Sequence, residues 1–205
     1  MDLSYNTGNI FPVPIHVFDI KDFNLHQKDL IDYAYTLKSE DPDTPKRSNV
    51  GGWQSKSFNL NNKNDKLHSF LIGCISSLPA LKKNINLYVK AWVNINSPDS
   101  FNVQHNHPGC DLSGVLWVKC PKESGNIVFY SPSLFETFQE IESYTQDFKD
   151  SYNYHHNYWF PPIEGRMIMF PSHLQHEVKK NLSNEDRISA SFNIKLEDKK
   201  IVWLE

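Results

Sequence analysis

The second half of the chain is a series of short runs in which apolar and polar residues alternate. In the longest run, INLYVKAWVNIN at 85–96, one face carries Ile85, Leu87, Val89, Val93 and Ile95. Successive side chains of a β-strand point to opposite sides of a sheet, so this alternation predicts a strand with one apolar and one mixed face. Further runs of this kind lie at 101–107, 112–120, 126–131, 166–171, 176–180 and 187–196. Such a series, separated by turn residues, is typical of an antiparallel sandwich or jelly roll.

The residues before the first of these strands have the spacing of helices instead. Apolar residues recur at steps of three and four in 24–37 and again in 64–80, which predicts two amphipathic helices. A short edge strand is expected within 10–20, and the prolines and Gly-Gly pair of 39–55 predict a long loop. Residues 133–163 lack clear periodicity, and we interpret them as an insertion or lid. The predicted fold class is therefore α+β, mainly β, with N-terminal helices and a jelly-roll core.

Composition restricts the classes of function. The 205 residues are enough for one domain spanning 1–205 with a sizeable core. The formal net charge of −3 gives no basic footprint, so nucleic acid is not indicated as a partner. The three cysteines, an odd number, favour a reducing, cytoplasmic compartment. Since the chain has neither a long apolar run nor a leader-like start, we expect neither membrane spanning nor secretion.

The sequence QHNHPG places two histidines one residue apart. On the predicted strand, His105 and His107 share the apolar, core-facing side with Phe101 and Val103. Two imidazoles on one face of a strand can both reach a single metal ion. The alternative is a pair of buried histidines that are satisfied by backbone carbonyls, and an H-x-H pair alone is a weak signal for a metal site.

The last predicted strand has a polar face with an arginine at its start. Arg187, Ser189, Ser191 and Asn193 fall on one side of this strand, and apolar residues fall on the other. A polar face inside a small β-barrel is costly unless it holds a ligand, and arginine is suited to a bidentate grip on a carboxylate. The alternative for the arginine is a surface salt bridge. Ahead of it, His176 begins the preceding predicted strand.

Taken in order, these features resemble the Fe(II)- and 2-oxoglutarate-dependent oxygenases. That superfamily has an H-x-acid pair on one strand, a second histidine after a G-x-x-x-x-F-P strand, and an R-x-S motif further on. More narrowly, five segments are similar to the "putative 2OG-Fe(II) oxygenase" group of bacteria and phages. They are SNVGGWQS (48–55), WVNIN (92–96), HNHPGCDLSGVLWV (105–118), FPSHLQHEV (170–178) and RISASFN (187–193).

The resemblance implies a double-stranded β-helix (jelly roll, cupin-like) and an Fe(II)- and 2-oxoglutarate-dependent dioxygenase. The implied activity is hydroxylation of an unknown substrate with dioxygen, in which 2-oxoglutarate is decarboxylated to succinate. Residue by residue, His105 and His176 are implied iron ligands, and Arg187 with Ser189 is implied to bind the distal carboxylate of 2-oxoglutarate. Asn94 lies where related oxygenases often place a polar cosubstrate contact, although a structural hydrogen bond is an equal alternative. The implied setting is a bacterium or a phage-infected host cell.

Position 107 departs from the superfamily pattern, because it is histidine where most of these oxygenases have an acid. Three arrangements are open: His107 is the third iron ligand, Asp111 swings back to the ion, or a water completes the ligand set. Our hypothesis is the first, with His105, His107 and His176 as the metal ligands and, together with Arg187, as the catalytic residues. A set of three imidazoles is neutral, whereas the usual set of two histidines and a carboxylate is anionic.

Two other functions remain open from the sequence. One is a cosubstrate-independent, three-histidine cupin-type dioxygenase, which would leave Arg187 without a partner. The other is a non-enzymatic jelly-roll binding protein whose histidines are structural or bind zinc. The primary substrate is unknown at this level, because one fold of this kind supports many chemistries. Exposed edge strands favour a homodimer.

Overall fold

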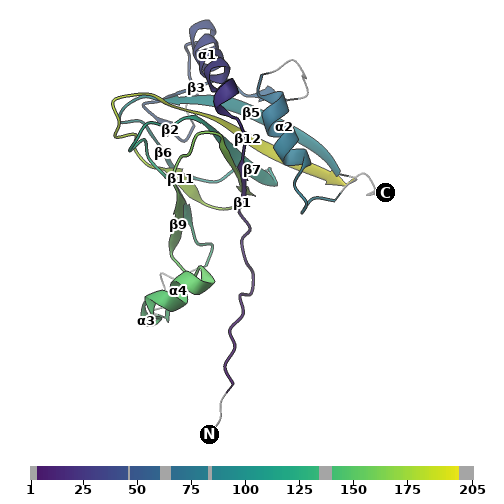
Figure 1. Ribbon diagram of the computed structural model, residues 1–205, viewed down its shortest axis with the longest axis vertical. Helices are drawn as coiled ribbons and strands as arrows, with labels where there is room; N and C mark the ends of the chain where they lie inside the picture. The colour runs from purple at the N-terminus through teal and green to yellow at the C-terminus, as the bar shows by residue number, and fades with distance from the viewer. Residues whose placement is uncertain (1–3, 46, 61–65, 83–84, 134–139, 199–205) are drawn as a thin grey trace.

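The computed structural model describes residues 4–45, 47–60, 66–82, 85–133 and 140–198. Its strands form two antiparallel sheets, and two helices cover one side of the larger sheet (Figure 1). The elements in chain order are β1 (His16–Asp19), α1 (Asn24–Glu40), β2 (Asn49–Val50), β3 (Trp53–Gln54), β4 (Phe58–Asn59), α2 (His68–Ser76), β5 (Ile85–Asn96), β6 (Phe101–His105), β7 (Leu112–Lys119), β8 (Ile127–Tyr130), α3 (Glu140–Ser143), α4 (Gln146–Tyr152), β9 (Asn157–Phe160), β10 (Arg166–Pro171), β11 (His176–Val178) and β12 (Arg187–Asp198).

Most successive strands of the second half alternate between the two sheets. The larger sheet has the order β1-β10-β7-β12-β5-β3, with β4 also paired to β5, and the smaller sheet has the order β2-β6-β11-β8-β9. The chain therefore crosses from β5 to β6, back to β7, and again to β8, so that strands distant in sequence become neighbours. This is the double-stranded β-helix expected above. It brings the end of β6 and the start of β11 side by side in one sheet.

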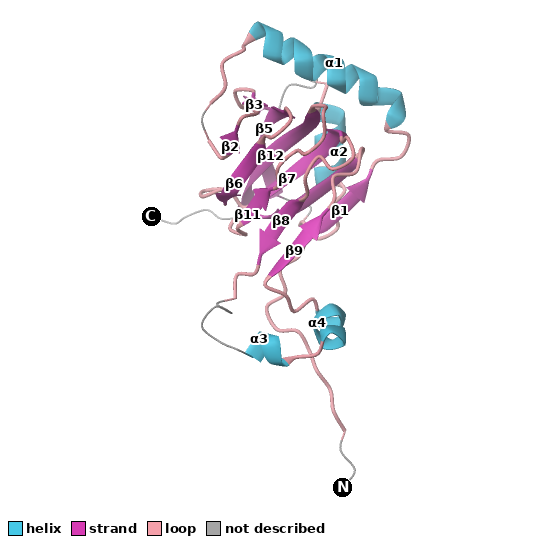
Figure 2. Cartoon of the chain, turned by 90° about the vertical axis from the view of Figure 1, so that its left-hand side faces the viewer, coloured by secondary structure: helices cyan, strands magenta, loops and turns pink. Residues whose placement is uncertain are grey.

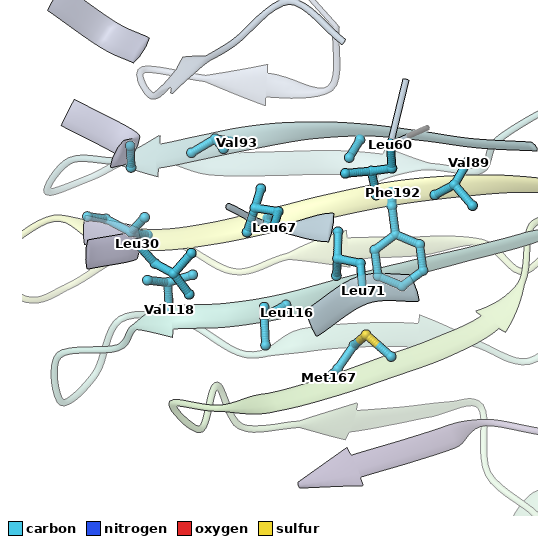
Figure 3. Close-up of a cluster of buried hydrophobic side chains, with 14 of the residues drawn as sticks. Leu30, Leu60, Leu67, Leu71, Val89, Val93, Leu116, Val118, Met167 and Phe192 are labelled. Carbon is cyan, nitrogen blue, oxygen red and sulfur yellow. The ribbon is translucent and has the colours of Figure 1, made fainter. Parts of the chain in front are cut away.

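The alternation along β12 separates a closed core from an open interior. Its apolar face, formed by Ile188, Ala190, Phe192 and Ile194, is almost fully buried and packs in one cluster with side chains of α1 and α2 (Figure 3). Burial of each large aliphatic side chain in such a cluster contributes roughly 1.5–3 kcal/mol. The opposite, polar face of β12 points between the two sheets, so the helices pack on the outer side and leave the interior to a cavity.

Several predicted boundaries differ from the structure. The helix predicted over 64–80 is shorter, at His68–Ser76, and positions 64–65 lie outside the described residues. The loop predicted over 39–55 contains β2 and β3, because Gly51, with a φ of +78°, turns the chain. Gly52 then runs against β5, where an added Cβ would lie 2.8 Å from the side-chain nitrogen of Asn96.

The segment predicted as an insertion or lid is an insertion that extends away from the main body. β8 and β9 form a hairpin whose connection carries α3 and α4, and both views place these helices beyond the end of the sheets, beside the N-terminal segment (Figures 1 and 2). The side chain of Asn9 donates a hydrogen bond to the carbonyl of Tyr152 at 3.1 Å. Together these segments line an aromatic cavity of about 680 Å³. Within the part of the chain that the structure describes, no helix has both the length and the apolar character needed to cross a membrane.

Candidate functional site

The space between the two sheets is a cavity of about 550 Å³. Its polar wall is formed by the inner faces of β5 and β12, and its apolar floor includes Val115, Trp117 and Phe170 from the second core cluster. Arg47, Ser48 and Gln54, from the segment predicted as a loop, also line it. None of the described residues between 140 and 163 does so, so the described part of the predicted insertion does not cover this cavity in the structure.

Three histidines meet on the wall of this cavity. His105 ends β6, His107 lies in the turn that follows, and His176 begins β11 as the direct cross-strand partner of His105. One nitrogen from each of the three rings lies within 4.8 Å of the others. Among the described residues, this is the one group of three or more such side chains close enough to share a metal ion.

His105 and His107 differ from the prediction in two respects. The strand predicted over 101–107 ends at His105, so His107 reaches the cluster from a turn rather than from the strand itself. The face that carries both histidines also carries Val103, which is 43% exposed, so it borders an open cavity and not a closed apolar core.

Backbone carbonyls orient two of the three imidazoles. The Nδ1 of His105 donates to the carbonyl of Val103 at 2.7 Å, and the Nδ1 of His176 donates to the carbonyl of Leu174 at 3.0 Å. Each Nε2 is thereby left unprotonated and available to a metal ion, the arrangement that metal-binding histidines usually show. The backbone-carbonyl interpretation and the metal interpretation are thus compatible, because one ring nitrogen serves each purpose.

Burial keeps the cluster neutral. Desolvation, followed by repulsion from His105, lowers the pKa of His107 to about 4. The same two causes lower the pKa of His176 to about 3, and burial also lowers the pKa of His105. All three rings therefore present a lone pair at neutral pH. Neutral imidazoles are suitable ligands for Fe(II), so the residues present fit the metal that the resemblance implies.

A pH-dependent loss of stability follows for the metal-free protein. A histidine of the unfolded chain takes up a proton near pH 6.5, whereas folded His107 and His176 stay neutral to about pH 4 and 3. Between these limits the unfolded state binds more protons, so stability falls as the pH falls. Between pH 7 and pH 5 we expect each of these two histidines to lower the free energy of unfolding by roughly 2 kcal/mol, as measured by urea unfolding. A His107→Gln variant is the control: it should lose less stability than the wild type, and an equal loss in both would contradict this account.

The Asp111 carboxylate is directed away from the cluster. It accepts a hydrogen bond from the backbone N–H of Leu196 at 2.7 Å, and the Asp111 backbone N–H donates to the carbonyl of Ile194 at 2.9 Å. Both contacts tie the turn after His107 to β12. The geometry therefore gives no support to Asp111 as the third ligand.

Arg187 is a buried cation on the same cavity. Its side chain is among the largest that are fully buried, which rules out the surface salt bridge considered above. Its Nη1 donates to the carbonyls of Ser124 and, at 3.0 Å, Gly125. No carboxylate pairs with it among the described residues, and burial lowers its pKa to about 10, so it stays charged at neutral pH. Its Nε and Nη2 remain to bind an anion, as a carboxylate of the cosubstrate would require.

The remaining predicted residues line the same cavity. Ser189 and Asn94 are cross-strand partners on β12 and β5, and both are 7% exposed. The Asn94 side chain also donates to the hydroxyl of Ser191 at 3.0 Å. The described residues that line the cavity include three cationic side chains, Arg47, Lys90 and Arg187, and no acidic side chain. The charge of the cavity wall therefore suits a dianion.

Two residues beside His107, Asn193 and Trp92, were not among the predicted site residues. The Trp92 ring lies 6.0 Å from that of His107, and the Asn193 amide lies 3.4 Å from the same histidine. Asn193 has the same strand parity as Arg187, which was the available signal. The histidines outside the predicted site stay outside it: His155 and His156 lie near Asp150 and Glu142 on the helical insertion.

A double-stranded β-helix whose interior carries an imidazole cluster and a buried arginine is the architecture that the resemblance implied, that of a non-haem iron oxygenase that uses 2-oxoglutarate. The family described as "Putative 2OG-Fe(II) oxygenase" matches residues 90–193, about half of the chain, and the chain belongs to this family. It is therefore an enzyme, with Fe(II) and 2-oxoglutarate as cofactor and cosubstrate. The sequence left two alternative functions open, a cosubstrate-independent dioxygenase and a non-enzymatic binding protein. Family membership shows that both alternatives are wrong.

Solved structures share the fold at low sequence identity. A Pseudomonas putida prolyl-4-hydroxylase has a TM-score of 0.62 and 12% identity, over 88% of this chain and 91% of that one. A Trichoplax adhaerens prolyl hydroxylase, in complex with a hypoxia inducible factor peptide fragment, has a TM-score of 0.62 and 13% identity, over 91% and 84%. HygX from Streptomyces hygroscopicus, with nickel and 2-oxoglutarate bound, has a TM-score of 0.54 and 10% identity, over 89% and 82%. No curated protein sequence matches the chain.

Proposed function

We propose that the protein is a hydroxylase in which His105, His107 and His176 hold Fe(II) and Arg187 anchors 2-oxoglutarate. The observation that carries this proposal is the presence, on the walls of one cavity, of the neutral imidazole cluster and of a buried guanidinium with no carboxylate partner among the described residues. Iron and 2-oxoglutarate, when bound, supply the oxidising chemistry with dioxygen, which yields succinate, carbon dioxide and a hydroxylated second substrate.

The imidazole cluster's task is to bind the metal without supplying charge. Two of its rings are fixed by backbone carbonyls, so their ligating nitrogens need little reorganisation when the ion arrives. Since all three ligands are neutral, no protein carboxylate cancels part of the metal's positive charge, and the negative charge of the cosubstrate is balanced by the metal and by Arg187.

Arg187 orients the cosubstrate by binding the carboxylate at the end distant from the metal. Its Nη1 is held by backbone carbonyls, and the rest of the guanidinium is free to grip a carboxylate in two hydrogen bonds. The Ser189 hydroxyl, two residues along the same face, is placed to donate a further hydrogen bond. Asn94 can donate or accept across the cavity, and the apolar floor around Phe170 excludes water from the reacting groups.

The test is turnover of 2-oxoglutarate by the reconstituted enzyme. Purified protein loaded anaerobically with Fe(II), then given 2-oxoglutarate, ascorbate and dioxygen, should form succinate and carbon dioxide in equal amounts, at a slow rate without a second substrate. Candidate substrates are then those that accelerate this turnover. Failure to form succinate, together with failure to bind 2-oxoglutarate by calorimetry, would contradict the proposal. Hydroxylation of a second substrate and the formation of a homodimer remain predictions.

A further inference from the structure

A chain of hydrogen-bonded side chains leads from two buried serines, through the half-buried Asn193, to His107. The hydroxyls of Ser172 and Ser113 lie 2.7 Å apart, and the Ser113 hydroxyl lies 2.8 Å from the Oδ1 of Asn193. The Asn193 Nδ2 lies 3.4 Å from the Nδ1 of His107. Ser113 is 1% exposed and Ser172 is 0% exposed, so solvent does not compete for these two hydroxyls. The chain joins β7, β12 and the end of β10, with Asn193 directly opposite Ser113 in the β7–β12 register.

The backbone of His107 is attached to the same group of residues. Its N–H donates to the carbonyl of Ser172 at 2.9 Å, and the Ser172 N–H donates to the carbonyl of Asp111 at 3.0 Å. The turn that carries His107 is therefore fixed to Ser172 at both ends. The main chain and the imidazole ring of this histidine are thus positioned by one connected network.

His107 differs from the other two histidines in the partner of its Nδ1. His105 and His176 each donate this hydrogen to a carbonyl of their own strand region, whereas the neighbour of the His107 Nδ1 among the described residues is a side-chain amide. A histidine that ligates through Nε2 carries its hydrogen on Nδ1 and needs an acceptor there. An asparagine supplies that acceptor when its amide turns by half a rotation, which places Oδ1 toward His107 and Nδ2 toward Ser113.

The two serines can follow this rotation. The Ser113 hydroxyl would accept from the Asn193 Nδ2 and donate to Ser172, because a hydroxyl is both donor and acceptor. Every member of the network then keeps a partner, which buried polar groups require. A carboxylate at position 107 would have no ring hydrogen, so it would not need the Asn193 amide as an acceptor. The amide is needed in this role only when position 107 is a histidine.

We propose that Asn193, held by Ser113 and Ser172, is the positioning residue of the third iron ligand, fixing His107 in the tautomer that ligates through Nε2. This inference rests on the three-histidine site of the proposed function. It predicts that the contribution of Asn193 to metal binding exists only while position 107 is a histidine.

The first test is the affinity for Fe(II), measured anaerobically by calorimetry without 2-oxoglutarate. Asn193→Ala should weaken binding by about 10- to 100-fold, the usual effect of removing the outer partner of a metal-binding histidine. The matched control is Asn102→Ala, which removes the same amide from the opposite wall, where it donates to Ser48 rather than to a histidine. This control should stay within about threefold of the wild type, and circular dichroism checks that both variants are folded.

A double-mutant cycle gives the decisive comparison. In a His107→Asp background, which keeps a ligand but removes the ring hydrogen, Asn193→Ala should change Fe(II) affinity by less than about threefold. An equal loss in both backgrounds would overturn the inference, because the asparagine would then act on folding or on the cavity in general. Wild-type affinity in Asn193→Ala would overturn it as well.

A spectroscopic readout is independent of affinity. In the protein loaded with diamagnetic Zn(II), the Nδ1 proton of His107 should give an NMR signal protected from solvent exchange, and Asn193→Ala should lose that signal while those of His105 and His176 persist. Persistence of all three signals in the variant would contradict the proposal. If His107→Ala binds Fe(II) like the wild type, the three-histidine site itself fails; if His107→Ala loses Fe(II) but Asn193→Ala does not, only the inference about Asn193 fails.

Discussion

Replacing His176 with alanine should weaken Fe(II) binding by more than about 100-fold and abolish succinate formation. Outer partners of metal-binding histidines are typically worth 10- to 100-fold in affinity, and removal of the ligand itself should exceed that range. His176 is 4% exposed and faces both other rings, with centroids 4.3 Å from His105 and 5.2 Å from His107. Without it, the two remaining imidazoles could not enclose the ion from three sides.

Fe(II) calorimetry under argon measures this effect, and His173→Ala is the matched control. His173 lies three residues earlier, is exposed and is not a member of the cluster, so its replacement should leave Fe(II) affinity within about twofold of the wild type. Retention of wild-type iron affinity by His176→Ala would show that the metal binds elsewhere.

Replacing Arg187 with methionine should raise the Kd for 2-oxoglutarate by about 100-fold while leaving Fe(II) affinity almost unchanged. Hydrogen bonds to charged groups contribute about 1.5–3 kcal/mol, and the latter figure corresponds to more than a hundredfold in binding. Methionine fills much of the same volume without a buried charge. Arg187→Lys keeps the charge but loses the forked geometry, so its effect on Kd should be intermediate, at about 10-fold.

Calorimetry of the Fe(II) protein with 2-oxoglutarate in the absence of dioxygen checks this prediction. Arg166→Met is a suitable control, because Arg166 pairs with Asp19 on the surface, with Nε at 2.7 Å from Oδ1, and does not line the cavity. Unfolding curves are needed for both Arg187 variants, because the carbonyls of Ser124 and Gly125 lose their donor. Unchanged 2-oxoglutarate affinity in a folded Arg187→Met protein would remove the arginine from the cosubstrate site.

Periodicity was sufficient to predict the framework of the fold. Each predicted run of the second half contains a strand, although β12 extends two residues further and β9 was not predicted. The polar face of β12 lines the interior, because side-chain alternation is a property of each strand by itself. The three histidines and Arg187 could therefore be proposed from the local pattern together with the resemblance.

Features that depend on pairing between distant strands could not be predicted in this way. The partner of His107 is Asn193, and it is held by Ser113, 80 residues away in the sequence. The short strands β2 and β3 form only because β6 and β5 offer free edges for them. The turn that carries His107 is likewise held by backbone hydrogen bonds with Ser172, which is distant in the sequence.

The helical insertion illustrates a different limit. Its lack of periodicity indicated an insertion, but composition does not say on which side of the sheets such an insertion lies. The structure shows that β9 extends the smaller sheet and that α3 and α4 lie at the far end from the helices α1 and α2 (Figure 2). The direction is determined by the hairpin pairing of β8 with β9, which the sequence did not reveal.

The most direct test of the central claim is a crystal structure of the protein grown anaerobically with Fe(II) and 2-oxoglutarate. We predict one iron bonded to the Nε2 atoms of His105, His107 and His176, with the distal carboxylate of 2-oxoglutarate on Arg187. Iron ligated by Asp111 or by a water in place of His107, or 2-oxoglutarate bound away from Arg187, would contradict it.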